Sequence, residues 1–177
     1  MKRLLPGLAT ATLVGVLLWS GAKTARAAAE LARAPSLGER TGLMEAANTP
    51  VRAGTPGLAK IAAAERAIVF VYASDCAVCH ANMANWTDLV ADLRGGPVRL
   101  FAVAPSSTPA ALGYWGALSR EVEIVTGTPA QLYGAFGVGS TPATLLVERG
   151  VIRGKVIGSL TEAAQRQVRA FAAPSQS

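Results

Sequence analysis

A continuous apolar run that leads into two closely spaced cysteines is the feature that most limits how this chain can fold. Residues 67–73 read AIVFVYA, a length and composition typical of a strand covered on both faces. From residue 76 to 93, apolar residues recur at spacings of three and four, which predicts an amphipathic helix ended by the Gly-Gly-Pro at 95–97. The sequence therefore predicts a buried strand feeding a helix, with Cys76 and Cys79 at the junction.

The rest of the chain predicts a mixed β-sheet flanked by helices, an α/β fold. Two strands at 143–147 and 151–157 are separated by only three residues, which predicts an antiparallel hairpin. The strand at 67–73 and a second at 98–104 form the two arms of a right-handed parallel crossover. The other expected elements are a helix opening at Thr108-Pro109 that buries Leu112, Trp115 and Leu118, a short strand at 121–125, a helix from Thr128 to Gly137, and a closing helix capped by Ser159 or Thr161.

The first 27 residues have the pattern of an export segment. Lys2 and Arg3 precede an uncharged run from residue 4 to 22, and Ala25-Arg26-Ala27 has the small-x-small form of a signal-peptidase site. An uncleaved membrane anchor through residues 4–22 is the alternative reading, because the run approaches the length of a membrane-spanning helix. Both readings place the rest of the chain outside the cytoplasm, in the periplasm. Residues 28–65, which prolines and glycines break repeatedly, are expected to form an irregular approach segment, and residues 66–173 the folded domain.

Composition excludes several classes of protein. Hydrophobic residues make up 51% of the 177 residues and charged residues 16%, which is incompatible with a disordered chain. The net charge is +6, but the excess of basic residues is concentrated in the first 27 positions. No basic stripe remains for nucleic acid, and we expect no nucleic-acid partner.

The two cysteines carry the chemistry that the sequence predicts. Residues three apart on a helix are near neighbours, close enough for a disulfide. A thiol at a helix N-terminus faces unpaired backbone N–H groups, which stabilise its thiolate. We therefore expect Cys76 to be the nucleophile and Cys79 to resolve the mixed disulfide. An inert structural bridge is the alternative, but so short a loop stabilises a fold weakly and suits reversible chemistry better.

The segments VYASDCAVC and GVGSTPATLLVERGVIRGKVIG resemble the thioredoxin superfamily, and the leader with the segment between the two halves resembles its TlpA-like extracytoplasmic branch. The resemblance covers about residues 60–172. It implies a thioredoxin-like fold and a protein-disulfide reductase in which Cys76 attacks, Cys79 resolves, and Pro142, with a cis peptide bond, faces the pair. A trans proline at the entry to a strand is the alternative reading of Thr141-Pro142. It further implies that Thr141 presents its backbone to a bound peptide. The implied partners are cysteine-containing secreted clients, such as apocytochromes in cytochrome c biogenesis, and a membrane thiol transporter as electron donor.

Two residues beside the cysteines depart from the pattern of that superfamily. Asp75 replaces the tryptophan that usually precedes the first cysteine. Its charge would oppose the helix dipole and raise the pKa of the thiol, which favours reduction of substrates. Capping of the helix by Asp75 is the simpler alternative. His80, on the first turn, is a second candidate for tuning the pKa of the pair.

The strongest rival function is a c-type haem protein. Residues 76–80 satisfy C-x-x-C-H, the attachment motif of c-type haem. Two observations argue against haem. The chain is predicted to contain several strands, whereas a small cytochrome is mostly helical, and the second axial ligand would have to be Met83, one turn from His80 on the same helix, or Met44, the one remote methionine after the leader. A third hypothesis is a catalytically idle adaptor that binds peptides in the groove beside Pro142. We expect no metal site and no cofactor other than the redox-active disulfide, because one C-x-x-C with an adjacent histidine lacks the second half of a zinc site.

Overall fold

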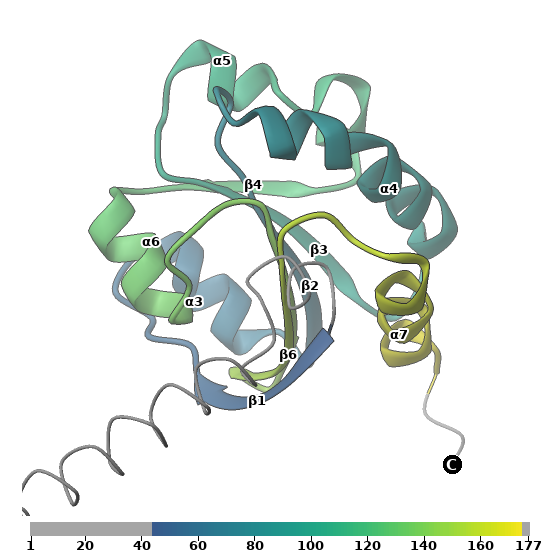
Figure 1. The fold of residues 1–177 in the computed structure, drawn as a ribbon. Helices are drawn as coiled ribbons and strands as arrows, with labels where there is room; N and C mark the ends of the chain where they lie inside the picture. The colour runs from purple at the N-terminus through teal and green to yellow at the C-terminus, as the bar shows by residue number, and fades with distance from the viewer. Residues whose placement is uncertain (1–43, 175–177) are drawn as a thin grey trace, which may run out of the picture. The chain divides into compact units, whose positions relative to one another are not determined.

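The computed structural model describes residues 44–174, and the predicted export segment lies outside this range. Six strands form one mixed sheet in the order β1-β6-β5-β2-β3-β4 (Figure 1). Strands β2, β3 and β4 run parallel to one another, while β5 is antiparallel to β2 and to β6, and β6 to β1. The strands are β1 (Met44–Pro50), β2 (Arg66–Val71), β3 (Arg99–Ala104), β4 (Glu123–Thr126), β5 (Ala143–Glu148) and β6 (Val151–Ile157).

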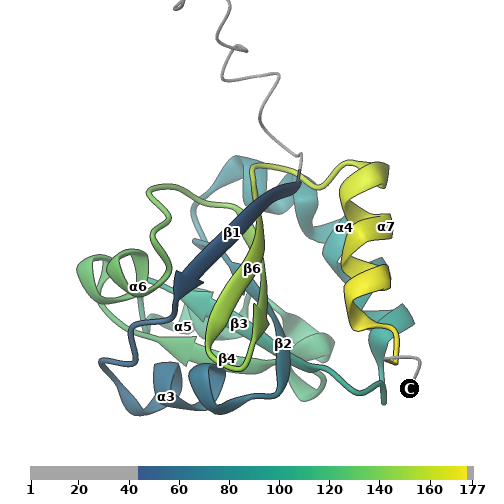
Figure 2. The same ribbon diagram turned by 90° about the horizontal axis from the view of Figure 1, so that it is seen from below.

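Helices cover both faces of the sheet, as the uninterrupted apolar strand β2 requires (Figure 2). Alternate residues of β2 pack into two clusters of buried side chains, one on each face. One cluster includes side chains of α4, α7 and the α5–η1 segment, and the other includes those of α3 and α6. The helices are α3 (Pro56–Ala63), α4 (Ala77–Leu93), α5 (Pro109–Gly113), the 3₁₀ helix η1 (Gly116–Arg120), α6 (Pro129–Phe136) and α7 (Glu162–Ala172).

Local sequence signals set most helix ends where we expected them. Thr128 caps α6 in a capping box with Gln131, and Gly137 ends the helix in the left-handed conformation. Thr161, rather than Ser159, caps α7. The prediction for residues 108–118 is wrong at Leu112, which is 46% exposed, because the segment divides into the short helix α5 and the separate 3₁₀ helix η1.

Residues 28–65 were expected to be irregular, and the structure contradicts this for most of residues 44–65, the part that it describes. Residues 44–50 form β1, which adds to the sheet by pairing with β6, and residues 56–63 form α3. Thr55 caps α3, and the buried side chains of Leu58 and Ile61 join the core. The folded domain therefore includes residues that the sequence assigned to the irregular approach segment.

The hairpin between β5 and β6 turns at Arg149 and Gly150, both with positive φ, as a type I′ turn requires. A Cβ atom on Gly150 would lie 3.0 Å from the carbonyl oxygen of Ala62. We expect Gly150→Ala to lower the free energy of unfolding by about 1–3 kcal/mol, because an alanine there has unfavourable φ and a close contact. Urea denaturation measures this loss. Gly134→Ala, in α6 with open space around it, is the control and should raise stability by up to about 1 kcal/mol; equal effects of the two changes would contradict the assignment.

Candidate redox site

The two cysteines lie where β2 passes into α4. Cys76 is the N-cap of this 17-residue helix, and Cys79 lies within its first turn. Their sulfur atoms are joined in a disulfide, with 5.2 Å between the Cα atoms. Cys76 is partly exposed, whereas Cys79 is fully buried in the core between α4 and the sheet. A partner protein can therefore reach the sulfur of Cys76 and not that of Cys79.

The helix N-terminus acts electrostatically on Cys76. The backbone N–H of Cys79 donates a hydrogen bond to Sγ of Cys76 over 3.1 Å. This N–H is among the unpaired donors at the positive end of the helix dipole. Such a donor stabilises a thiolate at Cys76 more than a neutral thiol, and so lowers the pKa of that thiol once the disulfide is reduced.

The start of β5 brings Thr141 and Pro142 to the cysteines. Because β5 pairs antiparallel with β2, Ala143 lies opposite Val71, and β5 begins at the edge of the sheet where β2 ends. The carbonyl oxygen of Thr141 lies 3.7 Å from Sγ of Cys76. Pro142 is buried, and the Thr141–Pro142 peptide bond is cis. The structure thus brings together residues 65 positions apart in the sequence.

Asp75 and His80 lie on either side of the disulfide, and both are exposed. Burial, with the negative charge of Asp75 as a second cause, raises the pKa of Tyr133 in α6, which places Asp75 within electrostatic range of that ring. Nε2 of His80 lies 3.0 Å from the carbonyl oxygen of Ser74, and the His80 ring packs on Tyr114 with 5.0 Å between centroids. His80 therefore ties the first turn of α4 to the loop that precedes Cys76.

Two hollows flank this loop. One, of about 440 Å³, is lined by Ser74, His80 and Tyr114 together with Met83, Ala110 and Gly113. The other, of about 330 Å³, includes Ser74 and Asp75 together with Ser106 and Thr108. An exposed apolar side chain, Val78, lies between the two cysteines. The surface beside Cys76 thus offers both apolar and polar contacts to a polypeptide.

The residues of the C-x-x-C-H motif do not fit a c-type haem. Both sulfur atoms that thioether attachment needs are in the disulfide, and Cys79 is enclosed by the core. Nε2 of His80 is occupied by the Ser74 carbonyl. Of the two candidate axial methionines, Met44 belongs to β1, where it pairs with Val156, and Met83 lies on α4, the helix that also carries His80. Within residues 44–174, no three His, Cys, Asp or Glu side chains gather to hold a metal ion.

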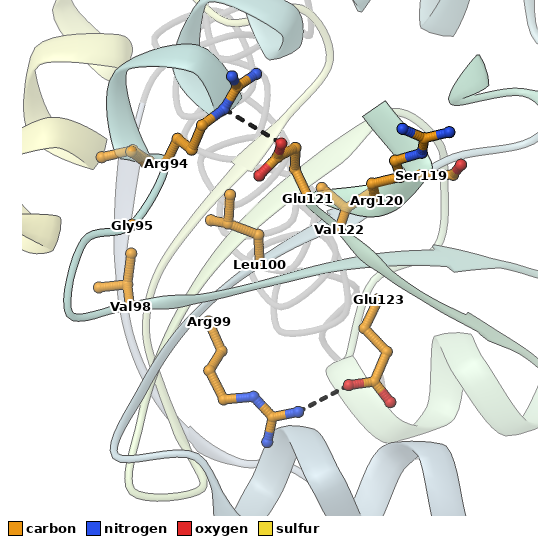
Figure 3. A pocket seen from close by; sticks show the side chains of 11 residues that line it. Arg94, Gly95, Val98, Arg99, Leu100, Ser119, Arg120, Glu121, Val122 and Glu123 are labelled. Carbon is orange, nitrogen blue, oxygen red and sulfur yellow. Dashed lines mark hydrogen bonds and ion pairs between the residues drawn. The ribbon is translucent and has the colours of Figure 1, made fainter. Parts of the chain in front are cut away.

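A separate pocket of about 380 Å³ is lined by several charged side chains (Figure 3). It lies at the end of α4 and the first residues of β3 and β4, and because β2 and β3 are parallel it is at the opposite edge of the sheet from Cys76. Its charges are largely paired: Arg94 with Glu121 over 3.3 Å, and Arg99 with Glu123 over 2.7 Å. Exposed pairs of this kind contribute little to stability. The hydroxyl of Ser119, which also lines the pocket, donates to the Gly116 carbonyl over 2.7 Å.

The sequence analysis missed two residues near the site. Tyr114 packs against both His80 and Tyr72, and burial raises its pKa. Asn82, one turn after Cys79, is a fully buried polar residue. The helical spacing of the apolar residues around position 82 was a usable signal for Asn82, since it places that polar side chain on the buried face of α4. No comparable signal pointed to Tyr114.

No protein-family model matches the chain, and no curated protein matches it significantly in sequence. Solved structures do match. StoA from Bacillus subtilis has a TM-score of 0.50 at 15% identity, over 76% of this chain and 99% of its own. A secreted Mycobacterium tuberculosis disulfide oxidoreductase homologous to E. coli DsbE has a TM-score of 0.50 at 14% identity, over 76% and 96%. The thioredoxin domain of a Bacteroides vulgatus thiol-disulfide oxidoreductase has a TM-score of 0.50 at 11% identity, over 75% and 96%.

These likenesses, at identities of 11–15%, show that the chain has a thioredoxin-like fold. The fold expected from the resemblance of the two sequence segments is therefore confirmed.

Proposed function

We propose that this protein is a thiol-disulfide oxidoreductase that reduces disulfides in exported proteins. One observation carries the proposal: a partly exposed sulfur at a helix N-terminus, bonded to a buried sulfur one turn inward. An inert bridge gains nothing from this asymmetry, whereas disulfide exchange needs one sulfur that substrates can reach and one that they cannot.

The reaction runs in two exchanges. The Cys76 thiolate attacks one sulfur of a client disulfide, so a Cys76–client bond forms and the other client sulfur leaves as a thiolate that takes up a proton. Cys79, after losing its proton to solvent, attacks Sγ of Cys76, and the second client sulfur leaves. The client gains two electrons and two protons, and the protein returns to its disulfide form. The Thr141 carbonyl, beside Cys76, is positioned to accept a backbone N–H of the client.

A reductant must then restore the dithiol. We propose a membrane thiol transporter for this role and secreted proteins that need reduced cysteines, apocytochromes among them, as clients. Export by the first 27 residues, into the periplasm, is part of the same proposal. A reductase in the periplasm is cut off from the reductants of the cytoplasm, so its electrons must come from across the membrane. Within residues 44–174, no helix has both the length and the apolar character needed to cross a bilayer.

The reduction potential of the pair, measured by equilibration of the purified protein with glutathione, tests the direction. We expect a value nearer the about −270 mV of reducing dithiol proteins than the about −120 mV of strongly oxidising ones. A potential near the oxidising value would reverse the proposed direction and leave the exchange chemistry intact.

The charge of Asp75 gives a second test of the direction. Asp75→Asn removes a negative charge next to Cys76, so the pKa of the Cys76 thiol should fall by less than about one unit and the potential should rise. Thiolate absorbance at 240 nm against pH, recorded in the Cys79→Ser background, measures the pKa of Cys76 alone. Glu162→Gln, which removes an exposed charge from the first turn of α7, is the control. An unchanged or higher pKa in the Asp75 variant would show that this carboxylate does not act on the thiol.

A further inference from the structure

Asn82 is a buried polar residue with half of its amide unpaired. Among residues 44–174, only Asn82 and Thr144 are buried with polar side chains, and the Thr144 hydroxyl accepts the indole N–H of Trp86 over 3.0 Å. Oδ1 of Asn82 accepts from the backbone N–H of Leu160 over 2.9 Å and from Nδ2 of Asn85 over 3.0 Å. Its own Nδ2 has no hydrogen-bond partner among the described residues. A buried donor left in this way lowers the stability of the fold.

The two donors on Oδ1 fix the direction of the amide. A flip of the side chain would turn the NH₂ group toward the Leu160 N–H and the Asn85 amide, and donor would face donor. Nδ2 therefore points away from the loop between β6 and α7. The oxygen is held from the side of Asn85, one turn toward the C-terminal end of α4, which leaves the nitrogen on the side away from Asn85.

Cys79 lies in that direction. It precedes Asn82 by three residues on α4, and both side chains are fully buried on the same side of the helix. Helix side chains at this spacing are neighbours and lean toward the N-terminus, so the Asn82 amide lies over the turn that carries Cys79.

We propose that Nδ2 of Asn82 donates a hydrogen bond to the Cys79 thiolate when the disulfide opens. In the disulfide form, no hydrogen bond joins Nδ2 of Asn82 to the Cys79 sulfur, which is neutral and a weak acceptor. In the mixed disulfide, Cys79 must lose its proton while buried, and burial alone raises the pKa of a thiol. A preplaced amide donor offsets that cost and speeds the second exchange, in which the Cys79–Cys76 bond forms and the Cys76–client bond breaks. This role rests on the proposed function.

The pKa of Cys79 tests the proposal without any enzymatic activity. The chain has two cysteines, so Cys76→Ser leaves Cys79 as the single thiol, and absorbance at 240 nm follows its ionisation. In this background we expect Asn82→Leu to raise the pKa of Cys79 by about one unit or more, a tenfold smaller thiolate fraction at a given pH. Asn82→Asp keeps the oxygen that Leu160 and Asn85 require, replaces the donor with an acceptor and adds a carboxylate, so the pKa of Cys79 should rise at least as far even if the leucine variant fails to fold.

Asn85→Ala is the matched control. It removes a partner of the same loop, since Asn85 also donates to the Leu160 carbonyl over 3.2 Å, and the Leu160 N–H still holds Oδ1 of Asn82, so Nδ2 keeps its direction. The pKa of Cys79 should then stay unchanged. An unchanged pKa in both Asn82 variants, or an equal rise in Asn85→Ala, would overturn the role and make Asn82 a structural tether.

A kinetic readout connects this role to catalysis. With both cysteines present, the mixed disulfide between Cys76 and insulin should decay about tenfold more slowly in Asn82→Leu, following the smaller thiolate fraction of Cys79. Equal decay in the wild type and this variant would contradict the proposal. Absence of any mixed disulfide in the wild type would instead refute the proposed function, while the pKa of Cys79 would still report on Asn82.

Discussion

Replacing Cys76 with serine is expected to lower the rate of insulin reduction to that of dithiothreitol alone. Cys76 is the sulfur that a client can reach and that the helix N-terminus activates, whereas Cys79 is enclosed by the core. A serine hydroxyl keeps the shape of the site but cannot form a disulfide, so neither exchange can occur. Insulin turbidity in the presence of dithiothreitol measures the rate.

Ala77→Ser, at an exposed position between the cysteines, is the control and should retain the wild-type rate. Circular dichroism should show the same fold for both variants, because the three-residue loop closed by the disulfide contributes little to stability. Activity above the dithiothreitol background in Cys76→Ser would contradict the assignment of the nucleophile.

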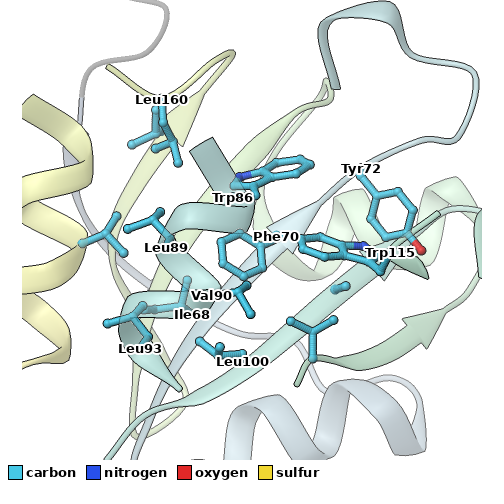
Figure 4. Packing of buried hydrophobic residues seen from close by; sticks show 14 of the residues in the cluster. Ile68, Phe70, Tyr72, Trp86, Leu89, Val90, Leu93, Leu100, Trp115 and Leu160 are labelled. Atoms are coloured by element: carbon cyan, nitrogen blue, oxygen red, sulfur yellow. The ribbon is translucent and has the colours of Figure 1, made fainter. Parts of the chain in front are cut away.

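Trp86→Ala should cause the largest loss of stability. Trp86 is fully buried in the cluster drawn in Figure 4, with ring centroids 5.6 Å from both Phe70 and Trp115. Removing so large a buried ring leaves a cavity, and changes of this kind cost about 3–5 kcal/mol. The Thr144 hydroxyl also loses the indole N–H that donates to it. Urea denaturation followed by circular dichroism measures the difference in free energy of unfolding.

Leu112→Ala provides the matched control, since this side chain is 46% exposed. Its effect should stay within about 0.5 kcal/mol. Trp86→Phe should fall between the two, because it keeps an aromatic ring and loses the hydrogen bond. A loss in Trp86→Ala no larger than that in Leu112→Ala would show that the described core does not hold the sheet and α4 together.

The sequence predicted the elements whose signal is local. The strand before the cysteines, the helix after them and the β5–β6 hairpin follow from apolar periodicity, caps and a short turn, and each is present. Strand β1 escaped prediction because MEAANTP has little strand propensity and exposes most of its residues. It is a strand because β6 offers it an edge, a tertiary cause that no local pattern records.

The same distinction applies to the site. The position of Cys76 and Cys79 at a helix start follows from their place in the chain, whereas the approach of Thr141 depends on β5 lying beside β2. The resemblance of the sequence segments implied this approach, and spacing alone could not. The unpaired Nδ2 of Asn82 could not be predicted at all. Its direction follows from the bonds that Leu160 and Asn85 make to Oδ1, and Leu160 reaches Asn82 only when α7 packs on α4.

Trapping of a client on the Cys79→Ser variant tests the central claim most directly. The reduced variant is mixed with insulin, free thiols are blocked, and the products are identified by mass spectrometry. We predict a covalent adduct through the sulfur of residue 76 that persists until dithiothreitol is added, because Cys79 is no longer present to resolve it. A variant that forms no adduct with disulfide-containing proteins, or a wild-type protein with a Soret band that survives denaturation, would contradict the account.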